Sequence, residues 1–73
     1  MTLTDVKVNS EYRITDVKCG ELRRRLLDMG FVPDSKIKVI GKAPFGETVL
    51  ICLRGINIAL RENATDSILV EAV

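Results

Sequence analysis

The sequence contains no histidine and no tryptophan, and its aromatic residues are one tyrosine and two phenylalanines. Histidine is the commonest general acid or base near neutral pH, so its absence weighs against an enzyme. The chain also lacks a G-x-x-x-x-G-K-[ST] phosphate loop, a G-x-G-x-x-G turn and a G-x-S-x-G nucleophile elbow. At 73 residues it forms one domain at most, with little room for a walled active site. We therefore predict a single, non-catalytic domain over residues 1–73.

Long apolar runs are missing as well. The longest uninterrupted apolar stretch, Val49 to Leu53, is far shorter than the ~20 residues that cross a bilayer. Polar residues at Thr2, Asp5 and Lys7 break up the start of the chain, which is not the pattern of an export signal. These features predict a soluble, cytoplasmic protein that does not insert directly into a membrane. The formal net charge of +1 provides no overall field to attract nucleic acid or an anionic membrane.

Cysteine is scarce, with one residue at position 19 and one at position 52. A disulfide is not expected in a reducing cytoplasm. A metal site needs about four ligands, typically Cys or His at close spacing, which this chain does not offer. We interpret Cys52 as a small core residue inside a strand. Cys19 precedes a glycine at a predicted turn, and its role stays open. The sequence predicts no cofactor and no metal ligand.

The most distinctive segment that is present carries three consecutive arginines, followed by a glycine and a proline turn. Apolar residues recur there at helical spacing, which predicts a helix over residues 21–29 with its apolar face formed by Leu22, Leu26 and Met29. Gly30 fits the left-handed position just after the helix, and Phe31 would then pack back on Leu26 in a Schellman stop. Asp28 opposes the helix dipole in the last turn. The sequence suggests two partners for its carboxylate, a neighbouring arginine or a backbone amide in the proline turn at 33–35, and does not decide between them.

Short segments with period-two alternation surround this helix and predict strands. They cover residues 12–17, 36–42, 48–54, 56–61 and 67–73, with an apolar lead-in at 3–8 and a polar turn at 63–66. In the fourth segment the apolar row is Ile56, Ile58 and Leu60. Five or six short strands and one helix indicate a mainly β, strongly bent sheet that curls into a small barrel. We expect the apolar helix face to cap the open end of this barrel.

These residues resemble the FeoA family. The resemblance rests on L-R-R-R-L-L-D-M-G-F-V-P-D at 22–34, A-P-F-G at 43–46 and L-R-G followed by I-N-I-A-L-R at 53–61. It extends from Leu3 to Val73, although the family usually has a Pro-Gly turn where this chain has Asn9-Ser10. The resemblance implies an SH3-like β-barrel with an inserted helix. It also implies a cytoplasmic accessory protein of bacterial ferrous iron uptake that acts with FeoB, a membrane transporter carrying a cytoplasmic GTP-binding domain.

The leading hypothesis is therefore a protein–protein interaction module for FeoB. Three successive helical positions span about 300° of arc, so at least one arginine must point away from the core. Arginine beside apolar surface is also typical of interfaces. The residues predicted to bind the partner are Arg23, Arg24, Arg25, Leu26, Leu27 and Phe45. In the alternative interpretation, the arginines form a solvated face with their stems packed over the barrel. A sharper variant makes one arginine a finger for the GTPase.

Two other functions remain as alternatives. A nucleic-acid- or ribosome-binding barrel would need a basic stripe with stacking aromatics, and this chain has few aromatics and nearly balanced charge, so we expect no nucleic-acid partner. An iron sensor or carrier would use imidazole and carboxylate ligands, whereas histidine is absent and the carboxylates are dispersed. The sequence does not determine the oligomeric state, because a small barrel can pair weakly with its own copy through an edge strand.

Overall fold

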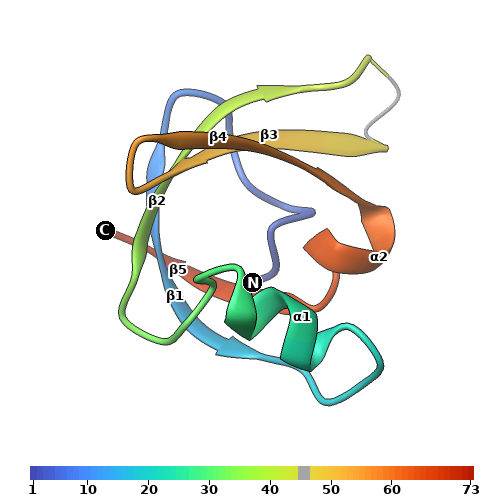
Figure 1. Cartoon of the computed structure of the whole chain (residues 1–73). Helices are drawn as coiled ribbons and strands as arrows, with labels where there is room; N and C mark the ends of the chain where they lie inside the picture. Colours follow the sequence, from blue (N-terminus) through green and yellow to red (C-terminus); the bar gives the residue numbers. More distant parts are fainter. Residues whose placement is uncertain (45–46) are drawn as a thin grey trace.

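One five-stranded antiparallel sheet, with the order β4-β3-β2-β1-β5, makes up most of the computed structural model (Figure 1). The structure describes residues 1–44 and 47–73. Along the chain the elements are β1 (Glu11–Val17), α1 (Arg23–Asp28), β2 (Lys36–Lys42), β3 (Thr48–Leu53), β4 (Ile56–Arg61), α2 (Glu62–Thr65) and β5 (Ile68–Ala72).

The sheet bends because its ladders are irregular at two places. The register shifts between Ile14 and Asp16 in β1, and between Val39 and Gly41 in β2. An extra residue on one strand of an antiparallel pair kinks that strand and increases its twist. The bent sheet encloses a single core, whose buried apolar side chains are Leu3, Val6, Tyr12, Ile14, Val17, Leu26, Phe31, Ile37, Val39, Val49, Ile51, Leu53, Leu60, Ile68 and Val70.

The predicted strands are confirmed with small shifts of their ends. The segments at 36–42 and 56–61 match β2 and β4, and the other three differ from the observed strands by one residue at one or both ends. The two-residue turn Arg54-Gly55 has φ of 52° and 82°, the conformation that suits a tight hairpin. The alternating pattern succeeds because β1, β2 and β3 each bury one face and expose the other at least in part.

Three predictions about individual segments are wrong. Residues 63–66 are not a simple polar turn, because α2 forms a helical turn there and buries Thr65. Ile56 does not join the inward row, since it directly follows the hairpin turn and is 64% exposed. Cys52 lies on the outward row of β3 and is only half-buried, so it is not a core residue.

The helix prediction is confirmed at its C-terminal end and corrected elsewhere. The amide of Phe31 donates to the carbonyl of Leu26 at 3.0 Å, and that of Gly30 donates to Leu27 at 3.0 Å, which is the Schellman pattern. The helix itself is shorter than predicted, covering Arg23–Asp28. Met29 is 42% exposed, so it does not contribute to the apolar cap.

The N-terminal segment and α2 help to close the barrel end that we expected α1 to cap alone. Leu3 and Val6 are 0% and 2% exposed, so the lead-in is part of the core. The hydroxyl of Thr4 donates to Asp66 and lies 3.1 Å from the hydroxyl of Thr65, which links the lead-in to α2. In Figure 1 the lead-in crosses the end of the barrel near both helices.

Replacing Gly30 by alanine is expected to lower the free energy of unfolding by about 2 kcal/mol, the typical cost of one strained backbone residue. Gly30 has φ of 108°, and a Cβ there would lie 3.3 Å from Cδ2 of Leu53. Urea unfolding followed by far-UV circular dichroism measures the change. Gly41→Ala is the matched control, because a Cβ at Gly41 meets nothing within 4 Å. Equal stability of the two variants would contradict this account of the helix stop.

Candidate protein interface on helix α1

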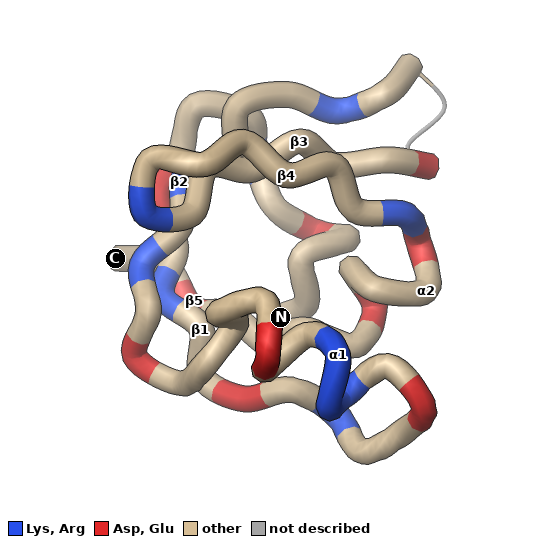
Figure 2. The backbone as a smooth tube through the Cα atoms, in the orientation of Figure 1, with Lys and Arg blue, Asp and Glu red and all other residues tan. Residues whose placement is uncertain are grey.

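Helix α1 presents a basic surface at one end of the barrel. In Figure 2 the consecutive arginines form one continuous blue segment of the helix. The side chains of Arg24 and Arg25 are exposed, whereas Arg23 is half-buried. Leu26 is buried, so its side of α1 faces the barrel. Because successive helical residues point about 100° apart, Arg24 and Arg25 lie on the opposite side.

Arg23 connects the helix to β1. Its Nη1 donates to the carbonyl of Val17 and lies 3.5 Å from Oδ1 of Asp16. Its side chain is 40% exposed, so the ion pair with Asp16 is partly screened by water. Arg23 therefore orients α1 on the barrel and has less freedom than its two neighbours to meet another molecule.

The two leucines predicted as partner-binding residues lie in different environments. Leu26 is 2% exposed and belongs to the core, so a partner cannot reach it on the surface. Leu27 is half-buried and packs against the core cluster from its rim. Met29, which we predicted on the apolar face of the helix, caps the C-terminal end of α1 and adds exposed apolar area there. The outward arginines are thus bordered by apolar surface, a composition typical of interfaces.

Phe45 and Asp28 are the two remaining residues that the sequence singles out. Phe45 lies outside the described residues. Asp28 is exposed, and its carboxylate forms no hydrogen bond or ion pair with any residue in the described ranges 1–44 and 47–73. Neither partner suggested by the sequence, a neighbouring arginine or an amide of the proline turn, holds its carboxylate there. Its charge stays beside the arginines and lowers the net charge of the α1 surface.

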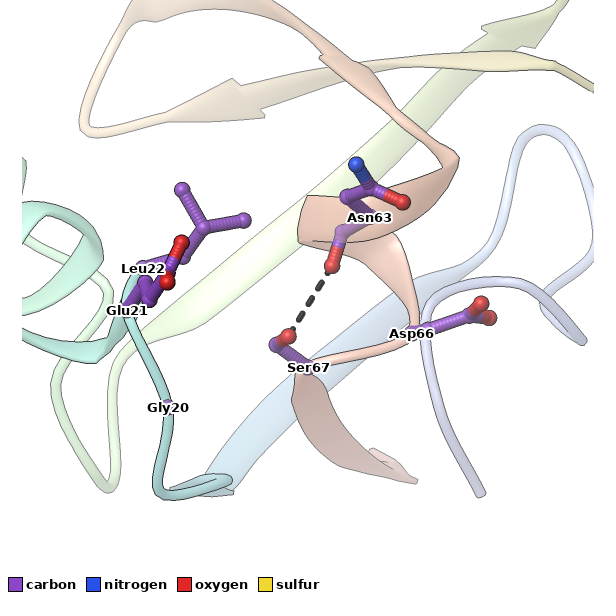
Figure 3. A pocket seen from close by; sticks show the side chains of 6 residues that line it. All are labelled: Gly20, Glu21, Leu22, Asn63, Asp66 and Ser67. Carbon is purple, nitrogen blue, oxygen red and sulfur yellow. Dashed lines mark hydrogen bonds between the residues drawn. The ribbon is translucent and has the colours of Figure 1, made fainter.

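A shallow cleft of about 390 Å³ separates the start of α1 from α2. Figure 3 shows Glu21 and Leu22 on one side, and Asn63, Asp66 and Ser67 on the other. The Ser67 hydroxyl donates to the carbonyl of Asn63 at 2.9 Å, so this polar wall is internally bonded. Sequence reasoning missed the cleft, because its walls lie about 40 positions apart along the chain and only the fold brings them together.

The described part of the chain shows no cluster of three or more His, Cys, Asp or Glu residues arranged to hold a metal ion. None of its helices has the length and apolar character needed to cross a bilayer. The surface that these residues do form is a basic helix with apolar flanks next to a polar cleft.

The bent five-stranded sheet with one helix inserted after the first strand defines an SH3-like barrel, and comparison with solved structures confirms this class. A FeoA from Stenotrophomonas maltophilia, solved with zinc and described as a prokaryotic SH3 domain protein, superposes with a TM-score of 0.86 at 25% identity, covering 97% of this chain and 89% of that one. The manganese-activated repressor ScaR shares the fold at a TM-score of 0.88 and 23% identity, although this chain spans only 35% of it.

The sequence model of the FeoA domain matches residues 1–72, so the chain belongs to the FeoA family. A FeoA-like protein from Clostridium acetobutylicum is 32% identical with a TM-score of 0.91, covering all of this chain and 86% of that one. Iron(II) transport protein A from Clostridium thermocellum is 35% identical with a TM-score of 0.91, and this chain spans 46% of its length. A search of curated proteins found no match. The family is associated with ferrous iron transport.

Proposed function

We propose that this protein is an accessory protein of ferrous iron uptake that binds the FeoB transporter through the α1 surface. We define that surface as Arg24, Arg25 and Leu27, with Phe45 as a further candidate from the sequence. The observation that carries the proposal is the arrangement of two exposed arginines beside the half-buried Leu27 on one short helix. Membership of the FeoA family supports the transport context.

The charge of this surface favours an acidic or phosphate-bearing region of the partner. Arginine binds carboxylates and phosphates with up to two parallel hydrogen bonds, which gives both orientation and energy. Leu27 can add apolar contact at the centre of such a site while it stays packed against the core cluster. Arg23 and Leu26 belong to the proposal as supporting residues, because one fixes the helix to β1 and the other fixes it to the core.

A binding titration tests this proposal directly. Purified FeoB, as the full-length transporter and as its cytoplasmic domain, is titrated with this protein while GTP hydrolysis is followed in the same samples. Saturable binding with a changed hydrolysis rate supports a regulator, and binding without a rate change supports a role in assembly or gating. If neither form of FeoB binds, the direct-partner proposal fails. A loss of stimulated hydrolysis in Arg24→Ala with unchanged binding would identify an arginine finger.

Leu27→Arg is expected to weaken binding to FeoB by at least about tenfold, because truncating or charging a central interface residue typically costs about 2 kcal/mol. Leu27 lies at the rim of the core, so the variant should remain folded by circular dichroism. Val8→Arg is the matched control, since Val8 is an exposed apolar residue in the loop before β1. If folded Leu27→Arg binds as tightly as Val8→Arg, the α1 surface is not the contact.

A further inference from the structure

The two edges of the sheet differ in how their backbone groups are used. At the β5 edge, the amide of Val70 donates to the carbonyl of Met1 at 2.8 Å, and the amide of Leu3 donates to Ile68 at 3.1 Å. Thr2 also forms a bridge with Leu69. The N-terminal segment therefore covers this edge as a short additional strand. Within residues 1–44 and 47–73, β4 pairs with β3 alone, so the opposite edge stays open (Figure 1).

The hairpin register shows which groups of β4 are available. The turn Arg54-Gly55 places Leu53 opposite Ile56, and in a two-residue hairpin that pair is hydrogen-bonded. Hydrogen-bonded residues alternate along an antiparallel ladder, so the amides and carbonyls of Asn57 and Ala59 point away from β3. No residue in the described ranges forms a backbone hydrogen bond with them. Both residues are exposed, so these four groups can accept a new strand.

The open edge has few of the features that usually prevent strands from pairing between molecules. Such features are charged residues, proline, a bulge or a covering segment. β4 contains no proline, its one charged residue is Arg61 at the last position, and its pairing with β3 is regular throughout. Ile56 is 64% exposed, the largest exposure of any large apolar side chain in the described part of the chain. This combination is typical of a strand that has a partner.

The sequence around β4 is complementary to itself. When two copies of β4 run antiparallel with Ile58 of each at the centre, Asn57 of one copy lies opposite Ala59 of the other, so the outward-pointing groups meet. Ile56 then lies opposite Leu60 of the second copy. Arg54 lies in the hairpin turn just before β4, and Glu62 begins α2 just after it. The two-fold axis therefore brings Arg54 of one copy to the same end of the paired strands as Glu62 of the other, at both ends. A copy of this chain thus fits the edge in hydrogen bonding, apolar contact and charge.

We propose that this protein forms a two-fold dimer in which the β4 strands of two copies pair antiparallel around Ile58 and join the two sheets. The contact is isologous, because each copy contributes the same strand. One short strand and its flanks bury less than the ~800 Å² per partner of a standard interface, so the dimer dissociates readily. It uses a different surface from α1 and does not depend on FeoB binding.

Sedimentation and amide exchange measured on the same samples test the dimer. From micromolar to millimolar concentration, the average mass is expected to rise toward that of two chains. Over the same range, the amides of Asn57 and Ala59 should become protected from hydrogen exchange, while exposed amides of the loops do not change. A protein that stays monomeric at millimolar concentration overturns the proposal. A dimer whose Asn57 and Ala59 amides remain unprotected also overturns it, because another surface then makes the contact.

A charge-swap series tests the register. Arg54→Glu and Glu62→Arg, each alone, turn two attractive pairs into two repulsive ones and should weaken dimerisation about tenfold. The double variant restores both pairs and should recover the dimer. Arg54 Nη2 donates to Ser35 Oγ at 3.3 Å, so Arg54→Gln serves as the control for loss of that bond. Asp5→Arg, an exposed charge reversal on the N-terminal segment, should have no effect. Failure of the double variant to recover the dimer would overturn the proposed register.

Discussion

Replacing Leu26 by arginine is expected to unfold the domain rather than to remove a contact from its surface. Leu26 is 2% exposed, and its carbonyl accepts the hydrogen bond that ends α1. An unpaired charge in such a site costs several kcal/mol. A domain of this size is stable by roughly 5 kcal/mol, so one substitution of this kind is sufficient. We expect the far-UV circular dichroism of Leu26→Arg to be that of an unfolded chain without denaturant.

Met29→Arg provides the control on the same helix. Met29 is 42% exposed, so the new side chain can reach water, and stability should change by no more than about 0.5 kcal/mol. A folded, cooperative Leu26→Arg protein would show that the core around α1 can rearrange, and would contradict the assignment of Leu26 as a fixed core residue. The comparison also has a functional consequence. Loss of FeoB binding in Leu26→Arg would report unfolding, so only Leu27→Arg tests the interface.

Leu3→Ala is expected to lower the free energy of unfolding by about 2–5 kcal/mol, the range for removing a buried leucine from a well-packed core. Leu3 is fully buried, although it lies in a segment that belongs to none of the five strands. Its amide also bonds to Ile68 at the edge of β5. Urea unfolding followed by circular dichroism measures the loss, since the chain has no tryptophan to report by fluorescence.

Val8→Ala is the matched control for this prediction. Val8 is an apolar residue of the same N-terminal region, but it is 41% exposed. Truncating it creates no buried cavity and should change stability by no more than about 0.5 kcal/mol. Similar losses in the two variants would mean that the N-terminal segment is only loosely attached. In that case the β5 edge would be as open as the β4 edge, and the asymmetry that supports the dimer would disappear.

The candidate site was predictable in part. Three consecutive helical positions guarantee that some arginine faces water, and the structure identifies Arg24 and Arg25 as the exposed ones. The choice between them and Arg23 could not be made from the sequence, because it depends on the carbonyl of Val17, which β1 places within reach of Arg23. Helical spacing placed Leu26 and Met29 on one face, but the helix ends at Asp28 and the chain turns at Gly30, which leaves Met29 in water.

Local sequence patterns were sufficient to predict the strands, the helix stop and the mainly β class of this protein. Those features depend on local periodicity and on residues such as Gly30, whose backbone preferences act over a few positions. The folded chain was needed to show that Leu3 and Val6 belong to the core, that the N-terminal segment covers β5, and that β4 keeps an open edge. These facts depend on contacts between residues more than 50 positions apart or on which strands become neighbours, and no local pattern encodes either.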